Sequence, residues 1–385
     1  HIGAGFGKPL LTMHNNTEGT ISYTNLICIP STRPFDLFNP DRKSSLKLYI
    51  NRVFITDKCD ALIPSYLRFI KGLVDTQDID LNVSREMLQN NPAVAKISKS
   101  LVGKILRELK KVSEKDLDGY KNFWKEYVAV LKEGLYEDAE RKETLLDLCR
   151  FSTNESDDPI SLSQYLEKMP DTQKEIYYIS AETSAQALAS PHLEGFKSKN
   201  IPVLIMTDAI DQFWLPMIGS FKEKKFTSIT QGKINLDEWD SKNKDQKNKS
   251  NDDKDKQDKE YVDLIAQLKV VLGDQVKDIR LSSKLTDSPV CLVADEGDMD
   301  IAMEQLMAQR DSNYKGAPRI LEINGDHSLI KNMKSLLSKK ESNDLVSDAG
   351  TLLFEQARLM EGKMPADPAQ FSKIMNQFLL KAIPN

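Results

Sequence analysis

Cysteine and histidine are scarce in this chain, and neither is spaced as a metal site or a disulfide framework requires. The 385 residues include four cysteines, which lie far apart and form no C-x-x-C pair. The four histidines show no spacing typical of metal ligands either. We therefore expect no structural zinc, no other bound metal and no disulfide framework. Reduced cysteines are typical of a cytoplasmic protein.

Long apolar runs are missing as well. No stretch approaches the ~20 apolar residues that a membrane helix needs, and no signal peptide is apparent in the sequence. The formal net charge is −5, which argues against a protein that neutralises phosphates along a basic face. The sequence thus predicts neither a membrane partner nor a nucleic-acid partner.

What the chain does contain is the composition of a globular protein, with 40% hydrophobic and 29% charged residues. Its length predicts two or three domains. Residues 21–30 and 46–56 alternate as strands do, and residues 94–109 and 123–131 repeat apolar positions at helical spacing. The early part of the chain is therefore expected to be mixed α and β.

A second αβ unit follows a polar turn near residue 158. Residues 176–179 and 201–206 are typical of strands, and a helix is expected between them at 183–189, which predicts a parallel strand pair. Residues 240–260 carry seven lysines and seven acidic residues with almost nothing apolar. This composition favours a solvated, flexible linker over an interaction tail.

The remainder of the chain predicts a third αβ unit that ends in two helices. The expected elements are a helix at 261–272, strands at 278–281, 290–293 and 319–323, a helix from Met299, and closing helices at 345–360 and 368–381. The predicted fold class is therefore α+β. An αβα-sandwich in two parts joined by helices (1–135 and 136–239) is followed by the linker (240–260) and a smaller mixed α/β domain (261–385).

One arginine stands in an unusual position, in the loop at residues 81–89. Asn82 and Ser84 are helix N-cap residue types, so Arg85 is expected at a helix start, where an anion is stabilised and a cation is not. A guanidinium there suggests a phosphate partner, and Gln89 lies one helical turn further on. The alternative is an ordinary surface ion pair between Arg85 and the glutamate that follows it.

Methionine is concentrated on one face of the helix expected near residue 300. Met299, Met303, Leu306 and Met307 lie at intervals of four, three and one, and acidic residues crowd the helix start. Such a face either packs in a core, which is its usual role, or forms an exposed binding surface that adapts to several partners.

The sequence from Tyr66 to Gln89 resembles the catalytic-loop signature of the ninety-kilodalton heat-shock chaperone family, bacterial type. The matching residues include Leu67-Arg68-Phe69, Lys71-Gly72 and Leu81-Asn82-Val83-Ser84-Arg85-Glu86. Further matches lie at 46–55, 190–194, 280–287 and 321–324. Because the chain opens at His1 within a stretch similar to the middle of longer family members, we expect a fragment. It would hold the middle and C-terminal domains and lack the N-terminal ATP-binding domain.

The resemblance implies half of an ATPase site. In the full-length protein, ATP with magnesium would bind the N-terminal domain, Arg85 would reach its γ-phosphate, and Gln89 would support the loop. The fragment alone is expected to bind no cofactor and to be inactive.

The resemblance also implies protein partners. These are the chain's own N-terminal ATPase domain, unfolded or partly folded client proteins, a co-operating seventy-kilodalton-class chaperone and a second copy of the chain in a homodimer. The implied client-binding residues are Met299, Met303, Leu306, Met307, Phe213 and Trp214. The implied dimer interface is a four-helix bundle formed by Leu352, Leu353, Leu359, Ile374, Met375, Phe378 and Leu379.

Two other functions stay open at this point. One is a transducer module of a related DNA-repair or topoisomerase-type ATPase, although the acidic net charge opposes it. The other is a dimerising scaffold that binds no client.

Overall fold

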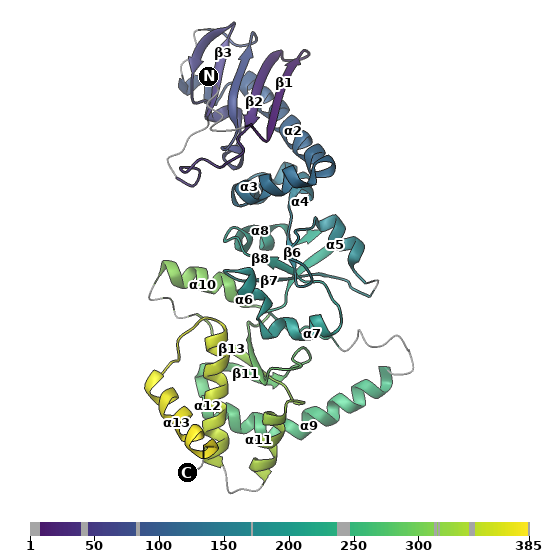
Figure 1. The fold of residues 1–385 in the computed structure, drawn as a ribbon, viewed down its shortest axis with the longest axis vertical. Coiled ribbons are helices and arrows are strands. Elements are labelled where there is room, and N and C mark those ends of the chain that lie inside the picture. Colours follow the sequence, from purple (N-terminus) through teal and green to yellow (C-terminus); the bar gives the residue numbers. More distant parts are fainter. Residues whose placement is uncertain are drawn as a thin grey trace. The chain divides into compact units, whose positions relative to one another are not determined.

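The computed structural model describes residues 8–39, 45–81, 85–170, 172–236, 247–311, 314, 316–338 and 343–383, with backbone only at 45, 85, 86 and 247–258. The chain divides into two compact units (Figure 1). The first comprises residues 1–151, 159–164 and 210–222, and the second comprises residues 152–158, 165–209 and 223–385. The boundaries at residues 135, 239 and 260 stay predictions. Within the described residues, no helix is long and apolar enough to cross a membrane.

A five-stranded sheet forms one layer of the first unit, in the order β1-β2-β5-β3-β4. Its strands are β1 (Leu11–Thr17), β2 (Tyr23–Ile29), β3 (Ser45–Ile50), β4 (Val53–Thr56) and β5 (Lys71–Thr76). Only β3 and β5 pair in parallel. The single strand predicted at 46–56 is wrong: Asn51 and Arg52 take positive φ values of 48° and 66°, and they turn the chain between β3 and β4. Consecutive positive φ values are typical of tight hairpin turns.

Helices complete the first unit. They are α1 (Arg85–Gln89), α2 (Pro92–Lys115), α3 (Leu117–Glu137), α4 (Lys142–Leu148) and α8 (Asp211–Ile218), with the short strand β9 (Ser220–Phe221) after α8. The two predicted amphipathic helices are confirmed as α2 and α3, since the apolar positions that define them are buried. Asn91 caps α2 by accepting hydrogen bonds from the backbone N–H groups of Ala93 and Val94, and Asp116 caps α3.

Four strands of the second unit belong to one small sheet, in which they are ordered β6-β8-β7-β10. They are β6 (Ser152–Thr153), β7 (Ile176–Ser180), β8 (Leu204–Met206) and β10 (Lys224–Ser228). The predicted parallel pair is confirmed, because β7 and β8 run parallel. The helices here are α5 (Leu162–Lys168), which starts in the first unit, α6 (Ser184–Leu188), η4 (Pro191–Leu193) and α7 (Glu194–Ser198).

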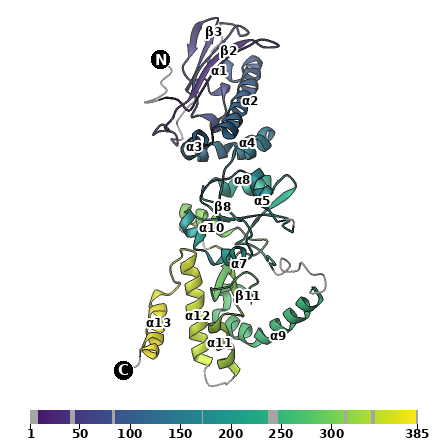
Figure 2. The ribbon, with the colours of Figure 1, turned by 45° about the vertical axis from the view of Figure 1, so that its right-hand side comes forward.

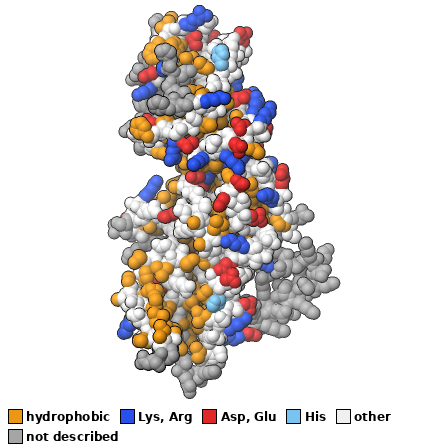
Figure 3. Space-filling view, viewed as in Figure 1, with side chains coloured by type: hydrophobic (Ala, Val, Ile, Leu, Met, Phe, Trp, Pro, Cys, Tyr) orange, Lys and Arg blue, Asp and Glu red, His pale blue; other side chains and the backbone are white. Residues whose placement is uncertain are grey.

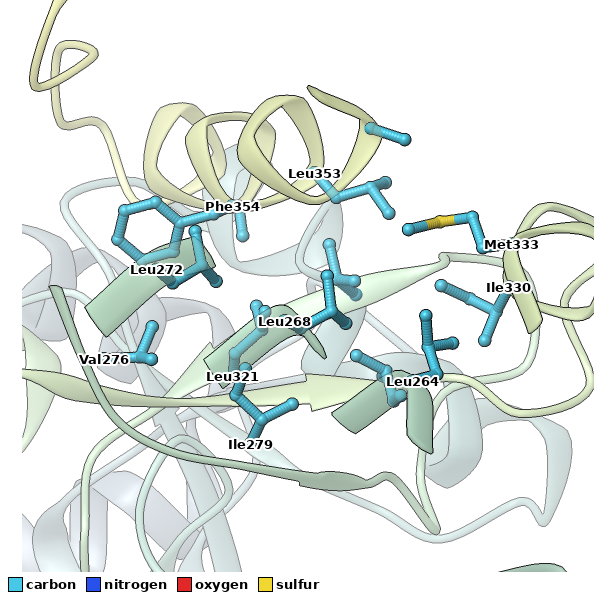
Figure 4. Packing of buried hydrophobic residues seen from close by; sticks show 14 of the residues in the cluster. Leu264, Leu268, Leu272, Val276, Ile279, Leu321, Ile330, Met333, Leu353 and Phe354 are labelled. Carbon is cyan, nitrogen blue, oxygen red and sulfur yellow. The ribbon is translucent and has the colours of Figure 1, made fainter. Parts of the chain in front are cut away.

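A three-stranded sheet and five helices make up the rest of the second unit. The strands β11 (Val276–Leu281), β13 (Arg319–Ile323) and β12 (Val290–Val293) lie in that order, and the helices are α9 (Lys247–Leu272), α10 (Ile301–Arg310), α11 (Ser328–Ser338), α12 (Asn343–Met360) and α13 (Pro368–Ala382). Helix α12 lies between α11 and α13 (Figures 1 and 2). Side chains of α9, α11 and α12 point toward one another over β11 and β13 and form a buried core (Figure 4). The α+β fold class is confirmed.

The charged stretch at 240–260 is only partly described. Residues 240–246 lie outside the described residues, whereas the backbone of 247–260 forms the first part of α9. The predicted helix start at Tyr261 is therefore wrong. The five lysines of residues 247–260 are good helix formers in solvent, so a composition that cannot build a core does not prevent a helix.

Glu194 joins two segments of the second unit that are far apart in the sequence. Its carboxylate accepts hydrogen bonds from the backbone N–H groups of Thr286, Asp287 and Ser288, at 2.8, 2.9 and 3.1 Å, and from the Ser288 hydroxyl. Partial burial raises the pKa of this carboxyl, but the hydrogen bonds together outweigh burial and hold the pKa below its ordinary value.

Candidate functional site

Helix α10 begins at a polar anchor. Asp300, its N-cap, accepts a hydrogen bond of 2.9 Å from the backbone N–H of Ala302. The same carboxylate also accepts hydrogen bonds from the hydroxyls of Ser228, the last residue of β10, and Thr230, two residues further on. The start of α10 is thus fixed by a capping carboxylate, and the helix begins at Ile301, two residues later than expected.

A buried ion pair holds the middle of α10. The Glu304 carboxylate accepts hydrogen bonds from Nη2 of Arg319 on β13 at 2.5 Å and from the backbone N–H of Ala317 at 2.9 Å. Nη1 of Arg319 donates to the carbonyl oxygen of Met299 at 3.1 Å. The two charged side chains are each only 4% exposed. Sequence reasoning missed this pair, although an acid four residues after the N-cap Asp300 is a visible signal.

Two amides continue the polar attachment along α10. Nε2 of Gln305 donates to the carbonyl oxygen of Glu361 at 2.6 Å, and Nε2 of Gln309 donates to Glu182 at 3.0 Å. All ten residues of α10 are described, and only Ile301 and Glu304 are buried. The helix is therefore held mainly through polar groups.

The predicted methionine face lies on the other side of α10. Met303, Leu306 and Met307 are partly exposed, and Met299 just before the helix is 45% exposed. None of the three helical residues of this face is fully buried, whereas the exposed residues of α10 are Ala308, Gln309 and Arg310 at its end. Part of the apolar surface of the helix thus remains in solvent.

The two predicted aromatic residues on α8 have different environments. Phe213 is partly exposed and meets the Tyr136 ring edge-on, with centroids 6.5 Å apart. Trp214 is fully buried, and its Nε1 donates to Asp211 at 2.7 Å. A buried indole has no surface to offer a client, so of the two predicted residues Phe213 is the one at the surface, and Met217 on the same helix is 60% exposed.

The loop at residues 81–89, which contains Arg85, is partly described. Arg85 is the first residue of α1, as expected, but its side chain lies outside the described residues, as do Asn82 and Ser84. Leu88 is buried beneath the helix and Gln89 is exposed. Within the described part of the chain, no group of histidine, cysteine or acidic residues is arranged to hold a metal ion.

Exposed apolar side chains occur in the segments around this loop and on β4. Leu81 and Met87, on either side of Arg85, are exposed, as are Val53 and Phe54 on β4. These four apolar side chains are therefore exposed in the structure of this chain.

The predicted dimer residues of α12 and α13 are of two kinds. Leu353 and Ile374 are buried and Phe378 packs against the core of the same domain, whereas Leu359, Met375 and Leu379 are exposed and Leu352 is partly exposed. Four further exposed apolar residues escaped prediction: Met360, Met364, Leu380 and Ile383. Hydrophobic side chains gather over this part of the second unit (Figure 3). Helical spacing alone did not distinguish inward positions from outward ones.

Comparison with known proteins identifies a family for this chain. The family model described as "Hsp90 protein" matches residues 3–384. The protein called "Chaperone protein HtpG" in Roseobacter denitrificans is 44% identical over 385 residues, and the HtpG proteins of Paramagnetospirillum magneticum and Geobacter sulfurreducens are 44% and 40% identical.

These matches cover nearly all of the chain but only 61%, 61% and 58% of the relatives' own lengths. The match to one family along the whole chain leaves no support for a DNA-repair or topoisomerase-type transducer module. The chain belongs to the Hsp90 family, and it is similar to bacterial HtpG chaperones over about three fifths of their length.

Proposed function

We propose that this chain is the middle and C-terminal part of an ATP-dependent chaperone that binds unfolded or partly folded proteins. The observation that carries the proposal is the methionine face of α10, where Met303, Leu306 and Met307 keep part of their surface in solvent on the side away from Glu304, next to Met299, which is 45% exposed. Methionine side chains adapt their shape, which suits a surface that must bind many sequences. Phe213 on α8 is the second candidate contact.

Aggregation of a heat-unfolded protein tests this function. The chain should suppress light scattering by such a protein, and Met303→Asp should abolish the effect because a charge would interrupt the apolar face. Val270→Asp is a matched control, since Val270 is a more exposed apolar residue on α9, outside the proposed surface. Suppression that survives Met303→Asp would place client contact elsewhere on the chain, and no suppression by the original chain would favour a dimerising scaffold that binds no client.

We further propose that the surface around α1 docks a domain that holds ATP with magnesium. Bound ATP supplies the phosphate group that is transferred to water. The Arg85 guanidinium would stabilise charge on the γ-phosphate, and Gln89 would support the loop. Exposed Leu81 and Met87, which flank Arg85 in the sequence, support this proposal, because docking would remove them from water.

The exposed apolar residues of α12 and α13 support a homodimer. A two-fold interface would bury Leu359, Met375 and Leu379 in a four-helix bundle, with two helices from each copy. Cytoplasmic location is also part of the proposal, and the four described cysteines, which are buried and form no disulfide, suit a reducing compartment.

A further inference from the structure

We propose that Glu304 and Arg319 are positioning residues for client binding: their buried ion pair sets the rotation of α10 about its own axis. The proposal rests on the proposed client-binding function, which it deepens. Neither residue belongs to the apolar face, and both act through the helix that carries it.

The geometry of the pair restrains rotation. Arg319 holds α10 at two points: the carbonyl oxygen of Met299, just before the helix, and the carboxylate of Glu304, five residues later. Glu304 in turn is fixed by the backbone N–H of Ala317. The guanidinium is planar and its N–H groups have fixed directions, so hydrogen bonds at both points hold the helix in one orientation. Apolar contacts have no such directionality and allow a helix to slide.

A glycine in the loop before β13 lies next to the ion pair. Gly316 has a φ of +59°, and a Cβ added there would lie 2.7 Å from Oε2 of Glu304. Any other residue would therefore be strained and would also displace the carboxylate. The loop before β13 thus leaves space for this ion pair.

Stability alone does not account for such a pair. Replacing a buried ion pair by apolar groups of similar size often leaves stability unchanged or raises it. A helix turned further about its axis would bury the part of Met303 that remains exposed, as in ordinary amphipathic packing. We infer that the ion pair opposes that rotation and keeps the apolar face available.

The test replaces the pair without leaving a buried charge, in the double variant Glu304→Leu, Arg319→Met of the whole 385-residue chain. The probe is fluorescein-labelled, reduced and carboxymethylated lactalbumin, a soluble chain that stays unfolded. We expect an unchanged or higher melting temperature together with about a five- to tenfold rise in Kd. A purely structural role would instead make affinity follow stability. A folded double variant that binds with the original Kd would overturn the proposal.

A spectroscopic readout follows the helix itself. The native cysteines are buried, and burial raises the pKa of the Cys28, Cys59 and Cys291 thiols, so a nitroxide can be attached selectively at Arg310→Cys, on the last exposed residue of α10. The label should be more mobile in the double variant than in the original chain. In the single variant Arg319→Lys, which keeps the charge beside Glu304, its mobility should lie between the two. An unchanged spectrum would also overturn the proposal.

Gly316→Ala perturbs the ion pair without altering a charge. This variant tests the proposal if the double variant does not fold. It should raise both Kd and label mobility. Gly273→Ala is its control, because Gly273 also has a positive φ, of +50°, but nothing within 4 Å of an added Cβ. If the unmodified chain fails to bind the probe, or Met303→Asp has no effect, the client-binding function fails. Label mobility still decides the positioning role in that case.

Discussion

Lys132 on α3 places its ammonium 2.9 and 3.0 Å from the two carboxylate oxygens of Asp211 on α8, and the two side chains are only 3% and 0% exposed. The ammonium also lies 4.7 Å from the centroid of the Phe151 ring. Asp211 in addition accepts the hydrogen bond of the Trp214 indole. This buried pair attaches α8, and with it Phe213, to the long helix α3.

Removal of the Lys132 charge should be costly. Lys132→Met leaves the Asp211 carboxylate buried without its cation, so we expect the free energy of unfolding to fall by about 3–5 kcal/mol. Lys132→Met combined with Asp211→Asn, which keeps an acceptor for Trp214, should recover part of this loss. Urea titration of the chain measures both.

Lys110→Met is the control for that experiment. Lys110 pairs with Asp147 at 3.0 Å, but its side chain is 46% exposed. An exposed pair contributes about 0–1 kcal/mol. Equal losses for Lys110→Met and Lys132→Met would contradict the role given to burial.

Arg85→Ala should lower ATP turnover in the longer protein that contains the ATP-binding domain. An arginine supplied to the γ-phosphate contributes about 10³-fold or more to the rate of hydrolysis. Dimerisation should be unaffected, and Arg107→Ala, at an exposed position of α2, should leave turnover unchanged. A steady-state ATPase assay checks this, and normal turnover in Arg85→Ala would exclude the proposed role.

Leu379→Asp should dissociate the proposed dimer. Leu379 is half exposed on α13, so the substitution spares the core of its own domain but would bury a charge in a two-fold interface. Light scattering at micromolar concentration should show a dimer for the original chain and for Val270→Asp, and a monomer for Leu379→Asp. A monomeric original chain would refute the dimer.

His192 should make stability depend on pH. Complete burial, and after it the nearby Lys284 ammonium, hold the pKa of His192 well below its ordinary value. The unfolded chain binds a proton at this side chain below about pH 6.5, whereas the folded chain resists it. This part of the stability is therefore fully present above pH 6.5 and is lost as the pH falls, by up to about 1.4 kcal/mol per pH unit.

The variant His192→Gln lacks the side chain that binds this proton in the unfolded chain. The free energy of unfolding of the original chain should decline more steeply between pH 7.5 and 5.5 than that of the variant. His14→Gln, at an exposed position on β1, should leave the slope unaltered. Parallel slopes for the original chain and His192→Gln would show that this histidine does not contribute.

Local pattern predicted much of the fold. The period of apolar residues located α2 and α3, and the parallel pair of β7 and β8 followed from strand, helix and strand in succession. The turn at Asn51 and Arg52 was missed because it lacks the glycine that usually marks a hairpin. The start of α9 was missed because composition indicates what a segment cannot bury, not whether it is helical.

The candidate site was predictable only in its apolar half. Spacing grouped Met303 and Leu306 on one face, but it did not say which face of the helix is attached. That depends on Arg319, fifteen residues after Glu304 and on a strand, and such pairing is a property of the tertiary structure. The burial of Trp214 next to the partly exposed Phe213 was equally beyond local pattern.

The carboxylate of Glu194 is bound mostly by main-chain groups, and this determines which substitutions the region can accept during evolution. Every residue type except proline supplies the N–H donors found at Thr286 and Asp287, so the side chains there can vary freely while the attachment persists. No single replacement in that loop would compensate for loss of the acid. Covariation between Glu194 and residues 286–287 should therefore be weak, although the two segments are in direct contact.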